Sequence, residues 1–354
     1  MTIRERTEAM ECEVLSPYAA KSRESRGRPR PEEPCPVRTA FQRDRDRIIH
    51  VCKAFRRLSR KTQVFIAPEG DHYRTRLTHT LEVAQIGRTI AKGLGLNEEL
   101  TEAIALGHDV GHTPFGHTGE WSLDAAYREH EADAGFAHHE QSLRVVDVLE
   151  NDGKGLNLTH ETRDGILAHT KGESSTAEAL ERDLPATLEA MVVRLADRIA
   201  YVNHDVDDAM RAGILTHADI PAECSEALGL THSERIGTLV TDIITRSQDQ
   251  PRIRMSRPII EALDVLKDFL FARVYRGPGR ATQEHQRVDA LIRHLFAHHV
   301  EHPEALPEGF HPASDQRADV ARAVCDYIAG MTDNYARDRY VELTIPRGFV
   351  GRST

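Results

Sequence analysis

The sequence predicts an all-α fold built as one large domain. Apolar residues recur with a helical period from Arg43 onward, and the strict alternation typical of half-buried strands is rare. Glycine and proline gather between the periodic segments, at residues 67–70, 170–172 and 276–279. With 354 residues, of which 40% are hydrophobic and 29% charged, the chain can bury a sizeable core.

The first 36 residues differ from the rest in composition. They hold seven basic and seven acidic side chains, and the stretch from Ser22 to Pro31 is rich in Ser, Arg and Pro. Such a segment has little apolar surface to bury. We therefore expect an irregular arm over residues 1–36 that orders only on a partner or substrate.

The periodic segments that follow define the expected helices. They are bounded by the Gly and Pro clusters, by capping residues and by shifts in polarity. We expect helices over 41–59, 76–95, 97–109, 119–130, 138–150, 160–169, 187–212, 233–246, 257–273, 282–300 and 314–334.

The helix expected over 76–95 carries a histidine on its apolar face. His79 shares that face with Val83, Ile86 and Ile90, so its imidazole is expected to point into the core. Two interpretations stay open, a hydrogen-bonded core histidine and a metal ligand.

The next helix ends in a His-Asp pair. Asn97 is a favourable N-cap, and His108 and Asp109 close the helix just before Gly111 and Pro114. Two adjacent side chains at a helix end can converge on one ion, although such a pair also occurs often by chance.

The helix expected over 187–212 has one apolar and one polar side. The apolar side holds Leu188, Val192, Leu195, Ile199, Val202 and Val206, and the polar side holds Asp197, Tyr201, His204, Asp205 and Asp208. An acidic stripe usually faces water. Asp197, however, follows an apolar run and precedes Tyr201 by one turn, which also suits a carboxylate at the rim of a core.

Charge and cysteine content narrow the classes of function. Residues 37–76 hold eleven basic against four acidic side chains, a charge of +7, whereas residues 77–354 hold 28 against 45, a charge of −17. The basic segment would attract a polyanion, although a solvated basic face explains most of these arginines singly. The five cysteines are scattered, which excludes a thiolate zinc site and leaves histidine and carboxylate as metal ligands.

No stretch reaches the roughly 18 apolar residues of a membrane span, and the N-terminus is charged. We expect a cytoplasmic protein without a membrane partner.

Three strings and a remote aspartate carry a family resemblance. The strings read RLTHTLEV at 76–83, HDVGHTPFGHTGE at 108–120 and HEQS at 139–142, and the aspartate is Asp197. The pattern is similar to that of the HD-domain metal-dependent phosphohydrolases, and most closely resembles their deoxyguanosine triphosphate triphosphohydrolase branch. The resemblance implies an HD helical core over 37–212, with a C-terminal helical region over 213–354 packed on it.

The resemblance also assigns roles to residues. It implies that His79, His108, Asp109 and Asp197 hold one divalent ion, for which the ligand types admit Mg, Mn, Fe, Co, Ni or Zn. Catalysis is then expected from His117, Glu120 and His112, with His117 and Glu120 performing acid/base work. Substrate contacts are expected from Arg76, Gln63, His139, Tyr201, Asp205 and Lys267, of which Tyr201 and Asp205 would face the deoxyribose.

The implied reaction is hydrolysis of a deoxynucleoside triphosphate to a deoxynucleoside and tripolyphosphate. The family also implies a homo-oligomer, and it admits an allosteric nucleotide and single-stranded DNA as further partners. Two alternatives stay open. One is another HD phosphohydrolase, such as a nucleoside monophosphate phosphatase or a phosphodiesterase, and the other is a non-catalytic protein that binds nucleotide or nucleic acid.

Overall fold

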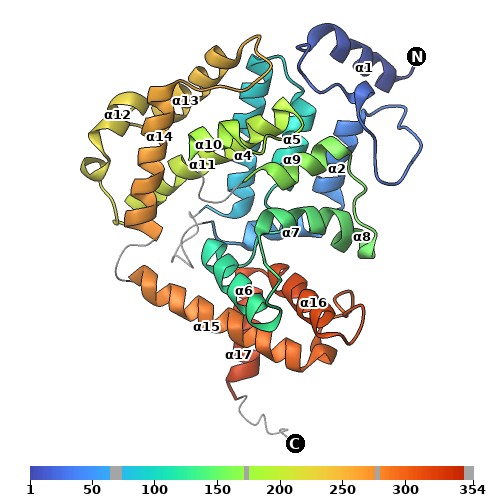
Figure 1. Ribbon diagram of the computed structural model, residues 1–354, viewed down its shortest axis with the longest axis vertical. Helices are drawn as coiled ribbons and strands as arrows, with labels where there is room; N and C mark the ends of the chain where they lie inside the picture. Colours follow the sequence, from blue (N-terminus) through green and yellow to red (C-terminus); the bar gives the residue numbers. More distant parts are fainter. Residues whose placement is uncertain (64–73, 171–174, 276–279, 347–354) are drawn as a thin grey trace, which may run out of the picture.

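A computed structural model describes residues 1–63, 74–170, 175–275 and 280–346 (Figure 1). Over these residues the chain is helical, with no strand beyond an isolated bridge between Thr62 and Thr75, so the all-α prediction is confirmed. The breaks expected at 67–70, 171–172 and 276–279 lie outside the described residues.

Helices α1 to α17 follow one another along the chain, α8 being a single turn. They are α1 (Ile3–Val14), α2 (Ala40–His50), α3 (Lys53–Arg57), α4 (Arg76–Gly93), α5 (Glu98–Gly107), α6 (Gly116–His130), α7 (His138–Arg144), α8 (Glu150–Gly153), α9 (His160–Ala168), α10 (Thr176–Glu181), α11 (Leu188–Arg211), α12 (Ala222–Leu228), α13 (His232–Ser247), α14 (Arg257–Leu270), α15 (Arg280–Glu301), α16 (Arg317–Ala329) and α17 (Asp333–Thr344). Short 3₁₀ turns lie at Ser22–Glu24, Leu58–Arg60, His217–Asp219 and Pro303–Ala305, and π-helical turns at Val145–Leu149 and Phe271–Tyr275.

Several expected helices end differently in the structure. The helix expected over 41–59 is split into α2, α3 and a 3₁₀ turn, because Cys52 is extended and its sulfur caps α3 at Phe55. The helix expected over 138–150 is α-helical only to Arg144. Helices α1, α10, α12 and α17 were not predicted; all but α12 begin at a threonine or serine N-cap.

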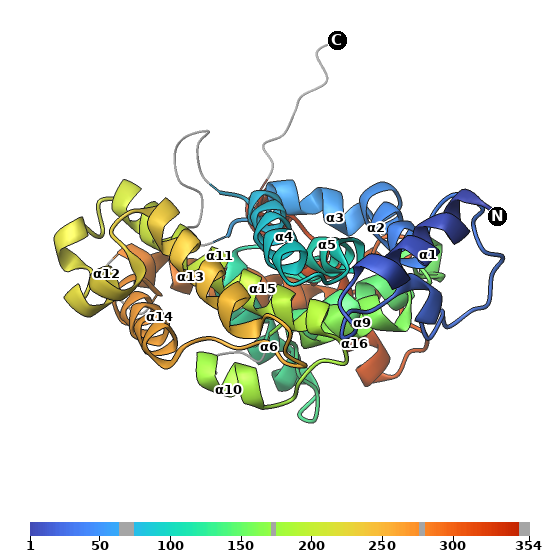
Figure 2. The same ribbon diagram turned by 90° about the horizontal axis from the view of Figure 1, so that it is seen from above.

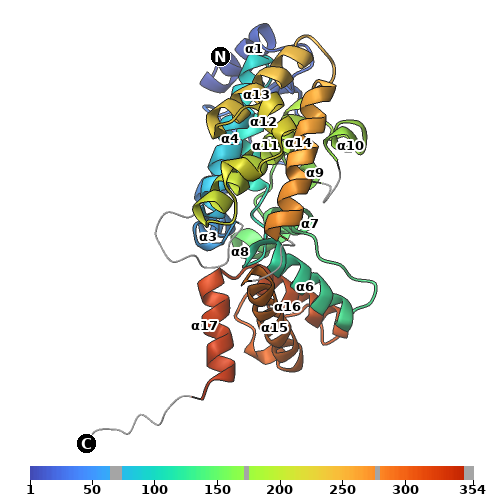
Figure 3. The same cartoon turned by 90° about the vertical axis from the view of Figure 1, so that its left-hand side faces the viewer.

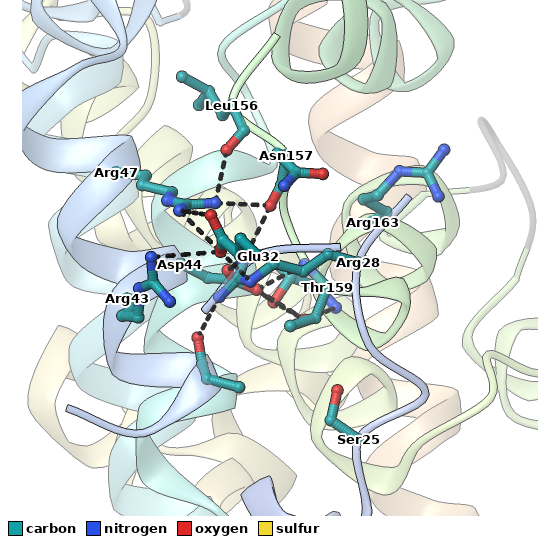
Figure 4. Close-up of polar contacts among 12 residues, drawn as sticks. Ser25, Arg28, Glu32, Arg43, Asp44, Arg47, Leu156, Asn157, Thr159 and Arg163 are labelled. Carbon is teal, nitrogen blue, oxygen red and sulfur yellow. Dashed lines mark hydrogen bonds and ion pairs between the residues drawn. The ribbon is translucent and has the colours of Figure 1, made fainter. Parts of the chain in front are cut away.

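The segment over residues 1–36, expected to be an irregular arm, contains one helix followed by irregular chain with a single 3₁₀ turn. Residues Ile3–Val14 form α1, whose first turn has a capping box between Thr2 and Glu5. Further along, Arg28 pairs with the fully buried Asp44 and donates to the carbonyl of Asn157 at 2.6 Å (Figure 4). The arm is therefore held to the rest of the chain by this buried ion pair and by the packing of Leu15, Ala19 and Ala20 on the larger apolar core.

The larger apolar core surrounds α4, α5 and α11. Helix α11 packs against both of the others, and Val192, Leu195 and Ile199 on it are fully buried. Asn97 caps α5, since its side chain accepts from the backbone N–H groups of Glu99 and Leu100 at 3.1 Å. Figure 2 shows α12, α13 and α14 at one end of this layer and α1 at the other.

A second apolar core joins α6 to the C-terminal helices α15, α16 and α17, below the larger core in Figure 3. Its side chains include Leu123 and Ala126 of α6 and Phe296 of α15. The division that we expect at residue 212 does not coincide with these cores, because α12 to α14 pack in the first and α6 in the second. Among the described helices, none is long and apolar enough to span a membrane.

Candidate active site

A cavity near the middle of the molecule gathers most of the residues that the sequence singled out. Its lining residues come mainly from α4, α6, α7, α11 and the end of α14, the helices labelled in Figure 1. It is lined by Gln63, Arg76, His79, Asp109, His112, His117, Glu120, Trp121, Asp124, Phe136, Ala137, His138, His139, Thr170, Asp197, Tyr201, Lys267 and Phe271.

One group in the cavity has the composition of a metal site. His79 Nε2 lies 3.0 Å from Asp197 Oδ1, and His108 Nε2 lies 3.7 Å from Asp109 Oδ1 and 3.8 Å from Asp197 Oδ1. His79 is buried, as its place on the apolar stripe predicts. Two imidazoles and two carboxylates from three separate helical segments thus point at one another.

The orientation of His108 fits a metal ligand. Its Nδ1 donates to the carbonyl oxygen of Ala105 at 2.6 Å, which leaves the lone pair on Nε2. That Nε2 is buried and has no hydrogen-bond partner among the described residues. An inward lone pair without a partner suits a cation, so the residues present fit a divalent ion.

The carboxylates of this group are held in the ionised form. Burial opposes the charge on Asp109, but the guanidinium of Arg76 together with the surrounding histidines outweighs it and lowers the pKa of this carboxyl well below its usual range. Arg76 Nη1 lies 2.6 Å from Asp109 Oδ2. For Asp197, burial is likewise outweighed by the hydrogen bond with His79 and by His108, which lower the pKa of its carboxyl.

A second polar group stands on α6 and α7. Glu120 Oε2 lies 3.1 Å from His117 Nδ1, and Glu120 Oε1 accepts from the backbone N–H and from Nδ1 of His138, both at 2.8 Å. The ring of His112 stacks on that of His138 at 4.7 Å. Possible ligand atoms of these four residues lie within 4.8 Å of one another, yet Glu120 already pairs with two of the rings. The group thus places one carboxylate between two imidazoles, an arrangement that can hold and pass on a proton.

The hydrogen bonds fix the protonation of His138. His169 Nδ1 donates to the carbonyl of Ile166 at 2.7 Å, so its Nε2 accepts from His138 Nε2 at 3.2 Å. Both nitrogens of His138 are then donors, and the ring is an imidazolium. Although burial opposes this charge, Glu120 raises the pKa of His138, while burial and the nearby His108 lower the pKa of His169 to about 3.

Most of the other residues predicted to contact substrate line the cavity, but one does not. Gln63, Tyr201, His139 and Lys267 line the cavity, whereas Asp205 is fully buried on α11 and is not among the lining residues. Burial raises the pKa of the Tyr201 hydroxyl, which keeps it neutral. The polar side of α11 does not face water, since His204, Asp205 and Asp208 are all buried.

Sequence reasoning missed His138 and His169. The resemblance pointed to His139, yet the neighbouring His138 is the one bonded to Glu120. The adjacent pair His138-His139 at the start of α7 was a signal, and both residues line the cavity. His169 ends α9, and its sequence context offered no comparable signal.

Two family models match the chain. One describes the HD domain and matches residues 76–202, which carry all four expected metal ligands. The other describes a phosphohydrolase-associated domain and matches residues 253–342.

The chain is similar over nearly its full length to proteins named deoxyguanosinetriphosphate triphosphohydrolase-like protein. The one from Caldanaerobacter subterraneus subsp. tengcongensis is 54% identical and aligns over 98% of this chain and 97% of its own. Those from Desulfatibacillum aliphaticivorans and Geobacter sulfurreducens are 46% and 43% identical, over 99% and 96% of this chain and 100% and 97% of their own. The chain therefore belongs to the deoxyguanosinetriphosphate triphosphohydrolase-like family of HD-domain phosphohydrolases.

Proposed function

We propose that this protein is a metal-dependent triphosphohydrolase that converts deoxynucleoside triphosphates, dGTP or several dNTPs, to a deoxynucleoside and tripolyphosphate. One observation carries the proposal: His79, Asp109 and Asp197 of the metal-ligand group and the hydrogen-bonded His117, Glu120 and His138 line one cavity. The names of the relatives support this substrate class.

The metal would be held by His79, His108, Asp109 and Asp197. When bound, a divalent ion supplies Lewis acidity toward a phosphate group and an attacking water. The rest of the chemistry belongs to the protein side chains around it.

Arg76 would bind the phosphates. One of its nitrogens holds Asp109, while Nε and Nη2 are buried and have no hydrogen-bond partner among the described residues. A guanidinium with two spare donors suits a phosphate group, because charge-assisted and bidentate hydrogen bonds are strong. His112, His139 and Lys267 would add contacts along the triphosphate.

His117 would donate the proton that the leaving O5′ needs. Water attacks the α-phosphorus, the bond from phosphorus to O5′ breaks, and a proton from His117 completes the deoxynucleoside hydroxyl. Glu120 would accept from Nδ1 of His117, which orients the ring for the transfer. His138, a cation bonded to the same carboxylate, keeps Glu120 ionised.

The sugar would be recognised from α11. Tyr201 would pack where a ribose carries its 2′-hydroxyl, and Gln63, which also lines the cavity, would contact the sugar. Asp205, expected at the 3′-hydroxyl, is buried outside that lining. An added hydroxyl would collide with the Tyr201 ring, which gives discrimination against ribonucleotides.

Incubation of the purified protein with each dNTP and Mn²⁺ or Mg²⁺, followed by ³¹P NMR, tests the proposal. Tripolyphosphate as the phosphorus product supports it. Pyrophosphate or orthophosphate instead assigns the protein to another class of HD phosphohydrolase. Binding without turnover under any of the metals favours a nucleotide sensor. The homo-oligomer, the allosteric nucleotide and single-stranded DNA stay predictions.

A further inference from the structure

The carboxylate of Asp333, the first residue of α17, reaches out of its own helix to Thr62 and Phe115, which lie within two residues of the cavity-lining Gln63 and His117. Its Oδ1 accepts from the backbone N–H of Phe115 at 3.0 Å. Its Oδ2 accepts from the backbone N–H of Thr62 at 2.9 Å and from the Thr62 hydroxyl. Two chain segments far apart in sequence are thus joined by one side chain of the C-terminal region.

The side chain of Lys61, next to Thr62, makes a second set of hydrogen bonds to the C-terminal helices. Lys61 is 2% exposed, and its side-chain nitrogen donates to the carbonyl oxygen of His112 and, at 2.7 Å, to that of Ala329 at the end of α16. Lys61 also accepts the backbone N–H of Arg76 at 3.1 Å through its carbonyl. Residues 61 and 62 are therefore a junction between α4, the loop after α5 and the C-terminal helices.

The segments held at this junction carry the chemistry of the site. Phe115 has φ 62° and ψ 28°, a left-handed conformation that a bulky side chain rarely adopts, and α6 with His117 and Glu120 starts directly after it. Gln63 follows Thr62, and a Cβ at Gly116 would lie only 3.1 Å from the backbone oxygen of Gln63. The direction in which α6 leaves the loop thus depends on the turn that Asp333 bonds.

The bonds of Asp333 are not those of an ordinary helix start. Thr332 already caps α17, accepting the backbone N–H of Tyr335 at 3.3 Å. Among the described residues, the Asp333 carboxylate accepts its hydrogen bonds from Thr62 and Phe115. A carboxylate in the first turn stabilises a helix electrostatically in any side-chain orientation. Helix stabilisation therefore does not explain why the Asp333 carboxylate points at Thr62 and Phe115.

We propose that Asp333 is a positioning residue of the active site, which sets the left-handed turn at Phe115 and thereby aims His117 and Glu120 at the metal-ligand group. The C-terminal bundle then acts as a part of the catalytic centre rather than as a separate appendage. The kinetic consequence rests on the proposed function, while the structural consequence does not.

The first test compares Asp333→Asn with Asp338→Asn, the same change at an exposed residue of the same helix. An asparagine keeps the size but offers one acceptor oxygen where two opposite N–H groups need one each. We expect kcat for dNTP hydrolysis to fall about 10-fold or more in Asp333→Asn, with KM and bound metal changed less than about threefold, because misplacing a catalytic group acts on the transition state. Asp338→Asn should match the parent protein.

The second readout needs no activity. Trp121 is the only tryptophan of the chain, lies one turn after His117 on α6, is 47% exposed, and its ring lies nearly parallel to that of His117. We expect Asp333→Asn to shift the emission maximum of Trp121 and to increase its quenching by acrylamide in metal-free protein, and Asp338→Asn to change neither. This readout decides the proposal even if the protein proves to have another substrate.

A third variant, Asp333→Glu, separates positioning from general stabilisation and covers the case in which Asp333→Asn does not fold. It keeps the negative charge at the start of α17 but moves the carboxylate by one methylene. If Asp333 only stabilised the helix, Asp333→Glu would retain the parent kcat and the parent Trp121 emission, and that result overturns the proposal. A reduced kcat and a shifted emission in Asp333→Glu support it.

Discussion

The carboxylate of Glu120 accepts a hydrogen bond from Nδ1 of His138 over 2.8 Å, so an acid of α6 and an imidazolium of α7 meet inside the cavity. Because this bond and the bond to His169 fix both nitrogens of His138, the ring is held in one orientation and one charge state. Glu120 in turn faces His117 with its other oxygen.

The first prediction concerns the hydrogen bonds that join His138, Glu120 and His117. His138→Gln should lower kcat by about 10²-fold, since Glu120 loses the cation that keeps it ionised and the bond that orients it toward His117. His139→Gln, the same change at the adjacent position, should cost less than about 10-fold because His139 contributes at most a phosphate contact. Steady-state kinetics with a dNTP and Mn²⁺ measure both. A larger loss of kcat in His139→Gln than in His138→Gln would show that His139, and not His138, is the histidine that supports Glu120.

The second prediction concerns the metal. Protein stripped with a chelator should melt at a higher temperature when Mn²⁺ is restored, because an ion at 100 times its Kd stabilises the folded state by about 2.7 kcal/mol. His108→Ala should abolish this gain, since its Nε2 lone pair is lost. His117→Ala should keep both the gain and the bound metal while losing turnover. Loss of metal in His117→Ala would contradict the ligand set that we assign.

The third prediction concerns the ordered N-terminal arm. Arg28→Met leaves the carboxylate of Asp44 buried without its guanidinium partner and should lower the free energy of unfolding by about 3–5 kcal/mol. Arg38→Met removes a pair with Asp46 whose arginine is 49% exposed, and should cost less than about 1 kcal/mol. Urea denaturation measures both free energies of unfolding. If Arg28→Met also lost less than about 1 kcal/mol, the buried pair that holds the arm would contribute little to folding.

The fourth prediction concerns pH. Burial raises the pKa of Glu189 to about 7, although its Oε1 accepts the backbone N–H groups of Ala20 and Asn97, each at 2.9 Å. A carboxyl whose pKa is higher in the folded state stabilises that state below its unfolded pKa near 4.5, and this contribution is lost as the pH rises through 7.

Glu189→Gln keeps the acceptor and removes the charge, so it should raise the free energy of unfolding by about 2 kcal/mol at pH 8 and by less than about 1 kcal/mol at pH 5. Denaturation of the parent and the variant at both pH values gives the difference. Glu13→Gln, at an exposed position of α1, should change neither value. A destabilised variant at pH 8 would refute the assignment.

Local patterns in the sequence predicted much of the fold. Helical periodicity and capping residues located α4, α5, α11 and α13 to within about two residues, because the apolar stripe and the caps are written in neighbouring positions. The short helices α10 and α12 were missed because six or seven residues show too little periodicity. The order of the arm was missed because it depends on Asp44 and Asn157, which only the folded chain brings to Arg28.

The residues of the candidate site likewise fall into those that local sequence patterns predict and those that only long-range contacts reveal. The strings around His79, His108 and His117 are local and could be selected from the sequence. The contact of His138 with Glu120 and that of Asp333 with Phe115 join distant segments, and no spacing along the chain encodes them. The polarity of α11 was ambiguous because a buried acidic side looks like a solvated one until its neighbours are known.

The position of helix α6 between the two apolar cores has a consequence for how the protein unfolds. It presents His117 and Glu120 to the cavity while Leu123 and Ala126 pack in the second apolar core. A helix shared in this way couples the two cores into one cooperative unit, since opening the C-terminal bundle strips α6 of its packing. Partial unfolding therefore yields no active fragment, and heat inactivation and loss of the C-terminal bundle should follow a single curve.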